Sequence, residues 1–110
     1  MSIFNFFKPY QYAAVAAGES GTIFSLKVPS GCKAYIQRTG NNWFQNTYFE
    51  WRVDGELVEK VERMIAPTPA PKPESPPIKA VEKIEWIAFN NSDSSHTFEV
   101  LQDGIFQEER

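Results

Sequence analysis

The 110-residue chain has little of the chemistry on which most enzymes depend, because it contains only one cysteine and one histidine, Cys32 and His96. A single cysteine excludes an intrachain disulfide, and one cysteine with one histidine does not supply the ligands of a usual zinc site. Cys32 shares the apolar face of an expected strand with Ala34 and Ile36, which indicates a buried thiol rather than an activated one. The sequence therefore predicts no catalytic residue, no metal and no cofactor.

The chain also has no large excess of charge of one sign and no long hydrophobic run. Eleven Lys and Arg residues against fourteen Asp and Glu residues give a net charge of −3, which argues against nucleic-acid binding, since phosphate contacts need a basic surface. The longest run of small apolar residues, 13–17, is far shorter than the ~20 residues of a membrane-spanning helix. No phosphate-binding, zinc-protease or serine-hydrolase motif occurs. We expect a chain that is not an enzyme and binds neither nucleic acid nor membrane.

What the chain has instead is many aromatic residues (three Trp, four Tyr and nine Phe) and a two-residue alternation of apolar and polar side chains. This period is typical of half-buried strands, and it is found in four runs: 22–28, 32–37, 43–53 and 96–101. Turn residues separate the runs, with Asp54-Gly55 the strongest hairpin signal. The pattern predicts an all-β fold, an antiparallel β-sandwich of about seven to eight strands, either jelly-roll-like or immunoglobulin-like.

Two stretches need separate interpretation. Apolar residues in 56–65 are spaced as a helical stripe, but the Asp54-Gly55 turn favours a returning strand. We expect a strand there, with a short helix at 56–65 as the alternative. Residues 78–89 are expected to form one long strand with apolar side chains on both faces.

Residues 1–9 and 67–77 do not follow the alternation. The first nine residues form an aromatic N-terminal arm that packs either on its own domain or on a neighbouring subunit. Six of the eleven residues in 67–77 are proline, so we expect a stiff exposed loop that joins neither a sheet nor a helix. The predicted organisation is an arm at 1–9 and a single sandwich domain at 10–110 that carries the proline-rich loop.

Two sets of residues are candidates for binding. The first is a partner-binding set on the arm and the loop: Phe4, Phe6, Phe7, Pro69, Pro71 and Pro73. The second is a sugar-binding set, in which aromatic faces stack on pyranose rings and amides bind hydroxyl groups: Trp43, Phe44, Asn46 and Trp86. A core role competes with the second set, because alternation places Trp43 on the buried side of its run.

One internal correspondence bears on the fold. Three dipeptides recur 49 residues further along the chain: Asn41-Asn42, Phe49-Glu50 and Asp54-Gly55 reappear as Asn90-Asn91, Phe98-Glu99 and Asp103-Gly104. They indicate either a duplicated strand-turn unit or the ordinary reuse of Asn, Asp and Gly in turns. Both interpretations favour an all-β fold.

The stretch Val28-Pro-Ser-Gly-Cys-Lys-Ala-Tyr-Ile-Gln-Arg-Thr-Gly40 resembles a pattern found in small β-sandwich structural proteins of tailed bacteriophages. Residues 85–91 and 98–104 have the same style of short strand and polar loop. The resemblance implies a virion protein, such as a head decoration or auxiliary capsid protein, on the capsid or tail surface after assembly in the host cytoplasm. It implies a homo-oligomer that binds the major capsid protein or neighbouring subunits, and it assigns no functional residue. The alternative is a carbohydrate-binding or host-receptor-binding module.

Overall fold

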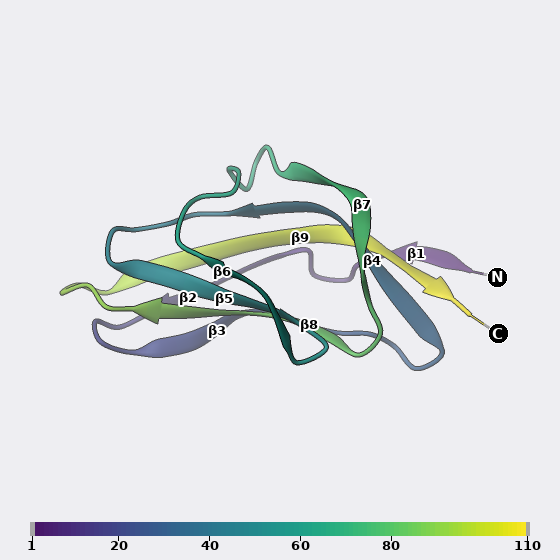
Figure 1. The fold of residues 1–110 in the computed structure, drawn as a ribbon, viewed down its shortest axis with the longest axis horizontal. Coiled ribbons are helices and arrows are strands. Elements are labelled where there is room, and N and C mark those ends of the chain that lie inside the picture. The colour runs from purple at the N-terminus through teal and green to yellow at the C-terminus, as the bar shows by residue number, and fades with distance from the viewer. Residues whose placement is uncertain (1, 110) are drawn as a thin grey trace.

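The computed structural model describes residues 2–109, and it is built of strands with no helix in that range (Figure 1). The strands are β1 (Ile3–Asn5), β2 (Tyr10–Val15), β3 (Ser20–Lys27), β4 (Cys32–Asn41), β5 (Thr47–Val53), β6 (Glu56–Val61), β7 (Lys72–Ala80), β8 (Lys83–Asn90) and β9 (His96–Glu108). The predicted β-sandwich is confirmed, with nine strands rather than seven or eight. No helix that could span a membrane is found among residues 2–109.

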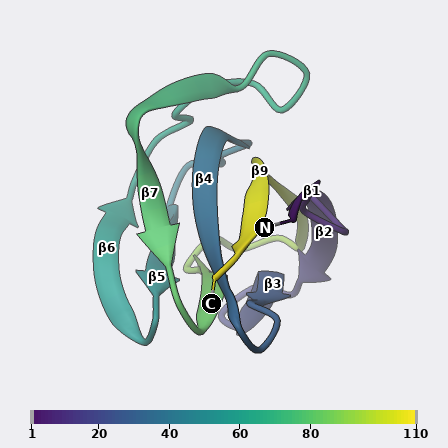
Figure 2. The same ribbon diagram turned by 90° about the vertical axis from the view of Figure 1, so that its right-hand side faces the viewer.

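Two antiparallel sheets make up the sandwich. Sheet A has the order β1-β9-β4-β7, with β2 pairing along the same side of β9 as β1. Sheet B has the order β3-β8-β5-β6. The thirteen residues of β9 are long enough to hold β1 near one end and β2 near the other. Seen along the strands, β1 and β2 lie on one side of the sandwich and β6 and β7 on the other (Figure 2).

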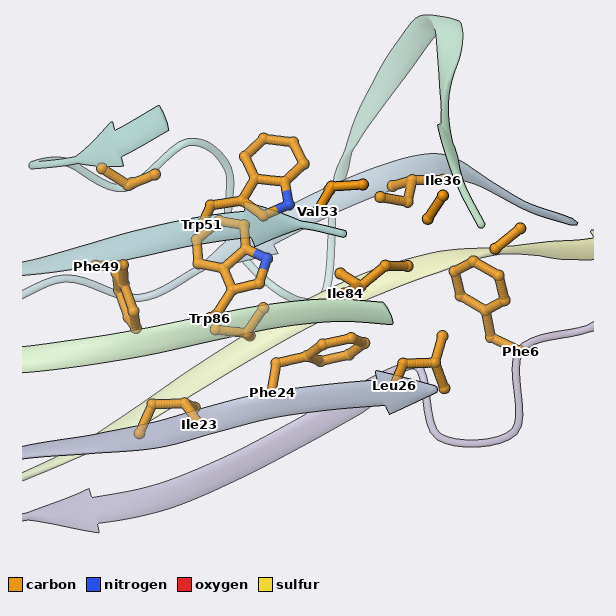
Figure 3. Close-up of a cluster of buried hydrophobic side chains, with 14 of the residues drawn as sticks. Phe6, Ile23, Phe24, Leu26, Ile36, Phe49, Trp51, Val53, Ile84 and Trp86 are labelled. Atoms are coloured by element: carbon orange, nitrogen blue, oxygen red, sulfur yellow. The ribbon is translucent and has the colours of Figure 1, made fainter. Parts of the chain in front are cut away.

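The core is aromatic, as the alternation predicts. Side chains on the inner faces of both sheets are fully buried, among them Phe49, Trp86 and Phe98. Trp51 and Trp86 stack with their ring centroids 5.1 Å apart (Figure 3), and Phe49 meets both Trp86 and Phe98 edge to face. Burial of each such side chain contributes roughly 1.5–3 kcal/mol to stability before the entropy of ordering is subtracted.

Residues 56–61 form β6, which confirms the strand and excludes the short helix. The expected single strand over 78–89 is wrong, because β7 ends at Ala80 and β8 begins at Lys83. The chain turns there from sheet A to sheet B. The Asp54 carboxylate holds this turn, since it accepts hydrogen bonds from the backbone N–H groups of Val81, Glu82 and Lys83, the shortest of 2.6 Å.

The proline-rich loop predicted at 67–77 is shorter than expected. Residues 72–77 belong to β7, where Pro73 pairs with Arg38. Proline is tolerated because β7 is an edge strand, so the missing N–H groups need no partner strand. The remaining loop crosses sheet A at Gly40, where an added Cβ would lie 3.1 Å from the backbone oxygen of Pro67.

The internal correspondence holds at two of its three dipeptides. Asn41 and Asn90 are both fully buried at strand ends, and their side-chain amides bind backbone groups of neighbouring segments. Phe49 and Phe98 are both fully buried in the core. The third pair differs: Asp54 and Gly55 are both left-handed in a hairpin turn (φ 55° and 83°), whereas Asp103 and Gly104 lie inside β9. Gly104 serves close packing there, because an added Cβ would meet the Tyr35 oxygen at 2.1 Å.

Candidate functional site

The rings of all three arm phenylalanines contact that of Phe106, but the three residues differ in burial. Phe4 lies in β1 opposite Phe106 of β9. Phe6 is only 5% exposed; its ring centroid is 4.8 Å from that of Phe106, and its N–H donates to the Gly104 oxygen at 3.0 Å. Phe7, in contrast, is 65% exposed. The first half of the arm is therefore part of the sandwich, and Phe7 is left on its surface.

Phe7 is one of several large exposed hydrophobic side chains close together in the sequence. Residues 2–109 expose nine large hydrophobic side chains, and four of them fall within residues 3–12. We call these four the N-terminal edge: Ile3, Phe7, Tyr10 and Tyr12. The two tyrosine rings lie 5.8 Å apart on the outer face of sheet A, and Lys8 is the only charged side chain in residues 2–15. The N-terminal edge is thus a largely aromatic surface with one positive charge on its own segment, Lys8, and one negative charge beside it, Glu99 of β9.

Tyr10 connects this edge to the loop between β6 and β7. Its hydroxyl donates to one Glu99 carboxylate oxygen at 3.2 Å, and the Thr68 hydroxyl donates to the other at 3.0 Å. Burial, the negative charge of Glu99 and this hydrogen bond raise the pKa of Tyr10 above its ordinary value. The phenol is a protonated donor at neutral pH, and its hydrogen bond to Glu99 fixes the ring on the outer face.

The structure brings part of the proline-rich segment near the N-terminal edge, because Thr68 and Tyr10 bind the same Glu99 carboxylate, but it places Pro73 elsewhere. Pro69 and Pro71 lie in the loop, and Pro73 lies in β7. In sheet A the strand β7 and the strand β1 are on opposite edges (Figure 2). The predicted partner-binding set is therefore divided at Pro73, which lies on the edge of sheet A opposite β1.

The sugar-binding set is divided in the same way. Trp86 is fully buried in the core, and Phe44 is turned inward, where its ring stacks on His96 at a centroid distance of 4.1 Å. Trp43 is 38% exposed, so its predicted burial is wrong: it lies before β5, outside the alternating strand. Only Trp43 and Asn46 share a surface, a depression of about 480 Å³.

Sequence reasoning missed most of the lining of this depression, which also includes Gln45, Thr47, Tyr48, Lys60, Glu62 and Asn91. Alternation carries the signal for Tyr48, which precedes the buried Phe49 and so points outward. Lys60 follows from the strand interpretation of 56–61 in the same way. The position of Asn91 beside Asn46 depends on a contact between distant loops, in which the Asn91 N–H donates to the Asn46 oxygen at 3.0 Å.

Cys32 and His96 both lie in packing positions. Cys32 is half-buried against the core, and His96 is stacked on Phe44. Among residues 2–109, no group of three or more His, Cys, Asp and Glu side chains is placed to hold a metal ion. No known family model matches the chain, and no curated protein matches it.

Proposed function

We propose that the protein is a non-catalytic structural subunit of a larger assembly, a bacteriophage virion protein of the capsid decoration or auxiliary type. Its β-sandwich fold is consistent with this role, and so is the resemblance of residues 28–40 to phage structural proteins. The observation that carries the proposal is the N-terminal edge, where β1, β2 and the segment between them expose four large apolar or aromatic side chains. Exposed apolar surface concentrated in one part of a small protein is typical of an interaction site.

The contrast with the other edge strands strengthens this argument. Charged residues or proline on an exposed edge strand usually prevent it from pairing with a strand of another chain. In β6 the exposed Leu57 and Val58 lie between charged residues, and in β7 prolines interrupt the edge. The N-terminal edge has only Lys8 and Pro9 between its strands. The strands of this edge themselves carry no charge and no proline, which suits them to a partner.

The partner that fits best is a second copy of this chain. In a two-fold contact the surface meets itself, and its neighbouring charges of opposite sign, Lys8 and Glu99, limit the charge repulsion between the copies. Tyrosine and phenylalanine are enriched in such interfaces. Burial of Phe7 and Tyr12 contributes roughly 1.5–3 kcal/mol per side chain, before the entropy of association is subtracted.

Light scattering across a concentration series tests the proposal on wild type, Tyr12→Lys and the control Val58→Lys, which places the same charge on an exposed position of β6. We expect wild type to form a closed homo-oligomer. Tyr12→Lys should weaken it at least about tenfold, and Val58→Lys should leave it unchanged. Thermal unfolding verifies that both variants fold. A wild-type monomer up to about 1 mM, where even an association of −4 kcal/mol is half complete, would overturn the proposal, as would equal weakening by both variants.

A further inference from the structure

A second surface, far from the N-terminal edge in sequence, is the depression beside Trp43. It lies where the loop before β5 meets the ends of β6 and β8, and its lining is aromatic and amide-rich. Its volume of about 480 Å³ falls within the range of small-ligand sites. A larger depression of about 640 Å³ near Lys27 and Lys83 has no aromatic side chain in its lining and mixes both signs of charge.

The Trp43 indole is held in place before any ligand arrives. Its Nε1–H donates to the Thr47 backbone oxygen at 2.9 Å. The Thr47 hydroxyl in turn donates to the Phe44 backbone oxygen at 2.6 Å. Thr47 therefore holds both the Trp43 side chain and the backbone of the loop that carries it. Because the only polar atom of the ring is already bonded, the exposed part of the indole offers an apolar surface. A rigid aromatic surface loses little entropy when a ligand binds to it.

The floor of the depression is rigid as well. The Tyr48 ring stacks on Phe89 with centroids 4.8 Å apart, and the Lys60 ammonium lies 4.5 Å from the centre of the Tyr48 ring. Lys60 also lies 3.9 Å from a Glu62 carboxylate oxygen. The two charges in the lining are opposite and adjacent, so the depression has no net charge and does not favour an anionic ligand.

Three side-chain amides complete the surface: Gln45, Asn46 and Asn91. All three residues are exposed, and within residues 2–109 their side chains make no hydrogen bond. Asn46 is fixed by its left-handed backbone (φ 62°) and by the hydrogen bond that its carbonyl accepts from Asn91. Each amide provides both donors and an acceptor, which is the chemistry needed to bind vicinal hydroxyl groups.

We propose that this depression binds a neutral glycan through a glucose- or N-acetylglucosamine-configured pyranose. The axial C–H groups of such a ring form an apolar face that stacks on Trp43, while its equatorial hydroxyl groups bond to the free amides at the rim. The paired charges of Lys60 and Glu62 explain the preference for a neutral sugar. This activity is independent of the proposed assembly role, because it uses none of the four residues of the N-terminal edge.

The test is titration of ¹⁵N-labelled protein with two probes, cellotriose and chitotriose, followed by two-dimensional NMR. Only Trp43 of the three tryptophans is exposed, since Trp51 and Trp86 are in the core, so one indole N–H signal should shift. We expect a dissociation constant between about 0.1 and 5 mM, in the range of a few weak contacts. Backbone signals of residues 45–48 and 91 should shift together with it.

Three variants identify the residues involved. Trp43→Ala should weaken binding at least about tenfold. Asn46→Gly keeps the left-handed turn and removes one amide, so it should weaken binding by roughly two- to tenfold and serves if Trp43→Ala does not fold. The control Tyr12→Ala, on the N-terminal edge, should leave binding unchanged.

The results divide cleanly. Loss of binding in Trp43→Ala or Asn46→Gly, together with normal binding in Tyr12→Ala, supports the site. Absence of any shift with both probes up to about 20 mM would overturn it, and so would binding that neither variant at the depression affects. Because Tyr12 belongs only to the assembly surface, failure of the glycan site leaves the proposed assembly role standing, and the reverse also holds.

Discussion

The side of the sandwich formed by β1, β2 and β3 and the side formed by β6 and β7 close the same two sheets with different chemistry (Figure 2). On the first side a neutral amide joins the sheets: Gln11 Nε2 donates to the Ser25 oxygen at 3.0 Å, and the Ser25 N–H donates to Gln11 Oε1 at 3.2 Å. On the second side a carboxylate does so, because Asp54 binds the turn that joins β7 to β8.

The difference explains which side is suited to a partner. The β6–β7 side is protected by prolines and alternating charges, and its closure depends on a charged group. The β1–β2 side is closed by a neutral side chain and anchored from inside by Phe6, while Phe7 and Tyr12 remain mostly exposed. Aromatic residues of one short segment thus have two roles, inward anchoring and outward exposure.

The largest expected effect separates these two roles. Phe6→Ala should lower the free energy of unfolding by about 3–5 kcal/mol, because it removes a buried ring that packs on Phe106 and over Gly104. The matched change Phe7→Ala should cost less than about 1 kcal/mol, since Phe7 is mostly exposed. Urea unfolding measures both values. If Phe6→Ala is too unstable to purify, Phe6→Leu should show a smaller loss in the same direction. Equal losses for Phe6→Ala and Phe7→Ala would remove the distinction between anchor and surface.

The second prediction concerns the charged closure of the β6–β7 side. Burial raises the pKa of Asp54, but the backbone N–H donors of Val81, Glu82 and Lys83 outweigh it and hold the pKa of that carboxyl below its ordinary value. Asp54→Asn keeps the left-handed turn and removes the charge, so it should cost about 1–2 kcal/mol at pH 7.

The pH dependence of this loss has a definite sign. Because the folded pKa is lowered, the stabilisation is fully present above the unfolded value of about 3.9 and is lost as pH falls through the folded pKa. Urea unfolding at pH 7, 5 and 3 should therefore show wild type and Asp54→Asn converging at the lowest pH. Asp93→Asn, an exposed loop control, should change stability by less than about 0.5 kcal/mol. A pH-independent difference for Asp54→Asn would contradict the role of the charge.

How much of the fold could be predicted from the sequence depends on whether the interactions that determine an element are local or join distant parts of the chain. Alternation predicts the inner faces of β3, β4 and β5, and the Asp54-Gly55 turn favours β6 over a helix, because these patterns are local. The proline content of 72–77 hides a strand, since proline disfavours a ladder in general but is accepted at an edge. Local composition cannot state which strand will be at the edge.

The candidate sites show the same limit. Trp43 and Trp86 have the same residue type, yet one is at a rim and the other is in the core. The difference follows from the start of β5 at Thr47, which leaves Trp43 in a loop. Asn46 and Asn91 are brought together by a contact between loops 45 residues apart, for which the sequence has no local signal. The nature of the binding residues is therefore predictable to a greater extent than their grouping.

The smallest expected effect tests the neutral closure of the β1–β2 side. Gln11→Ala should lower the free energy of unfolding by about 0.5–1.5 kcal/mol, because the Ser25 backbone groups it releases are exposed and can bind water instead. The same release should speed hydrogen exchange of the Ser25 amide. Gln37→Ala, another exposed glutamine, should change neither quantity. If Ser25 exchange is unaffected by Gln11→Ala, β3 is held by the core alone. The two sides of the sandwich would then differ not in the kind of polar closure but in whether they need one.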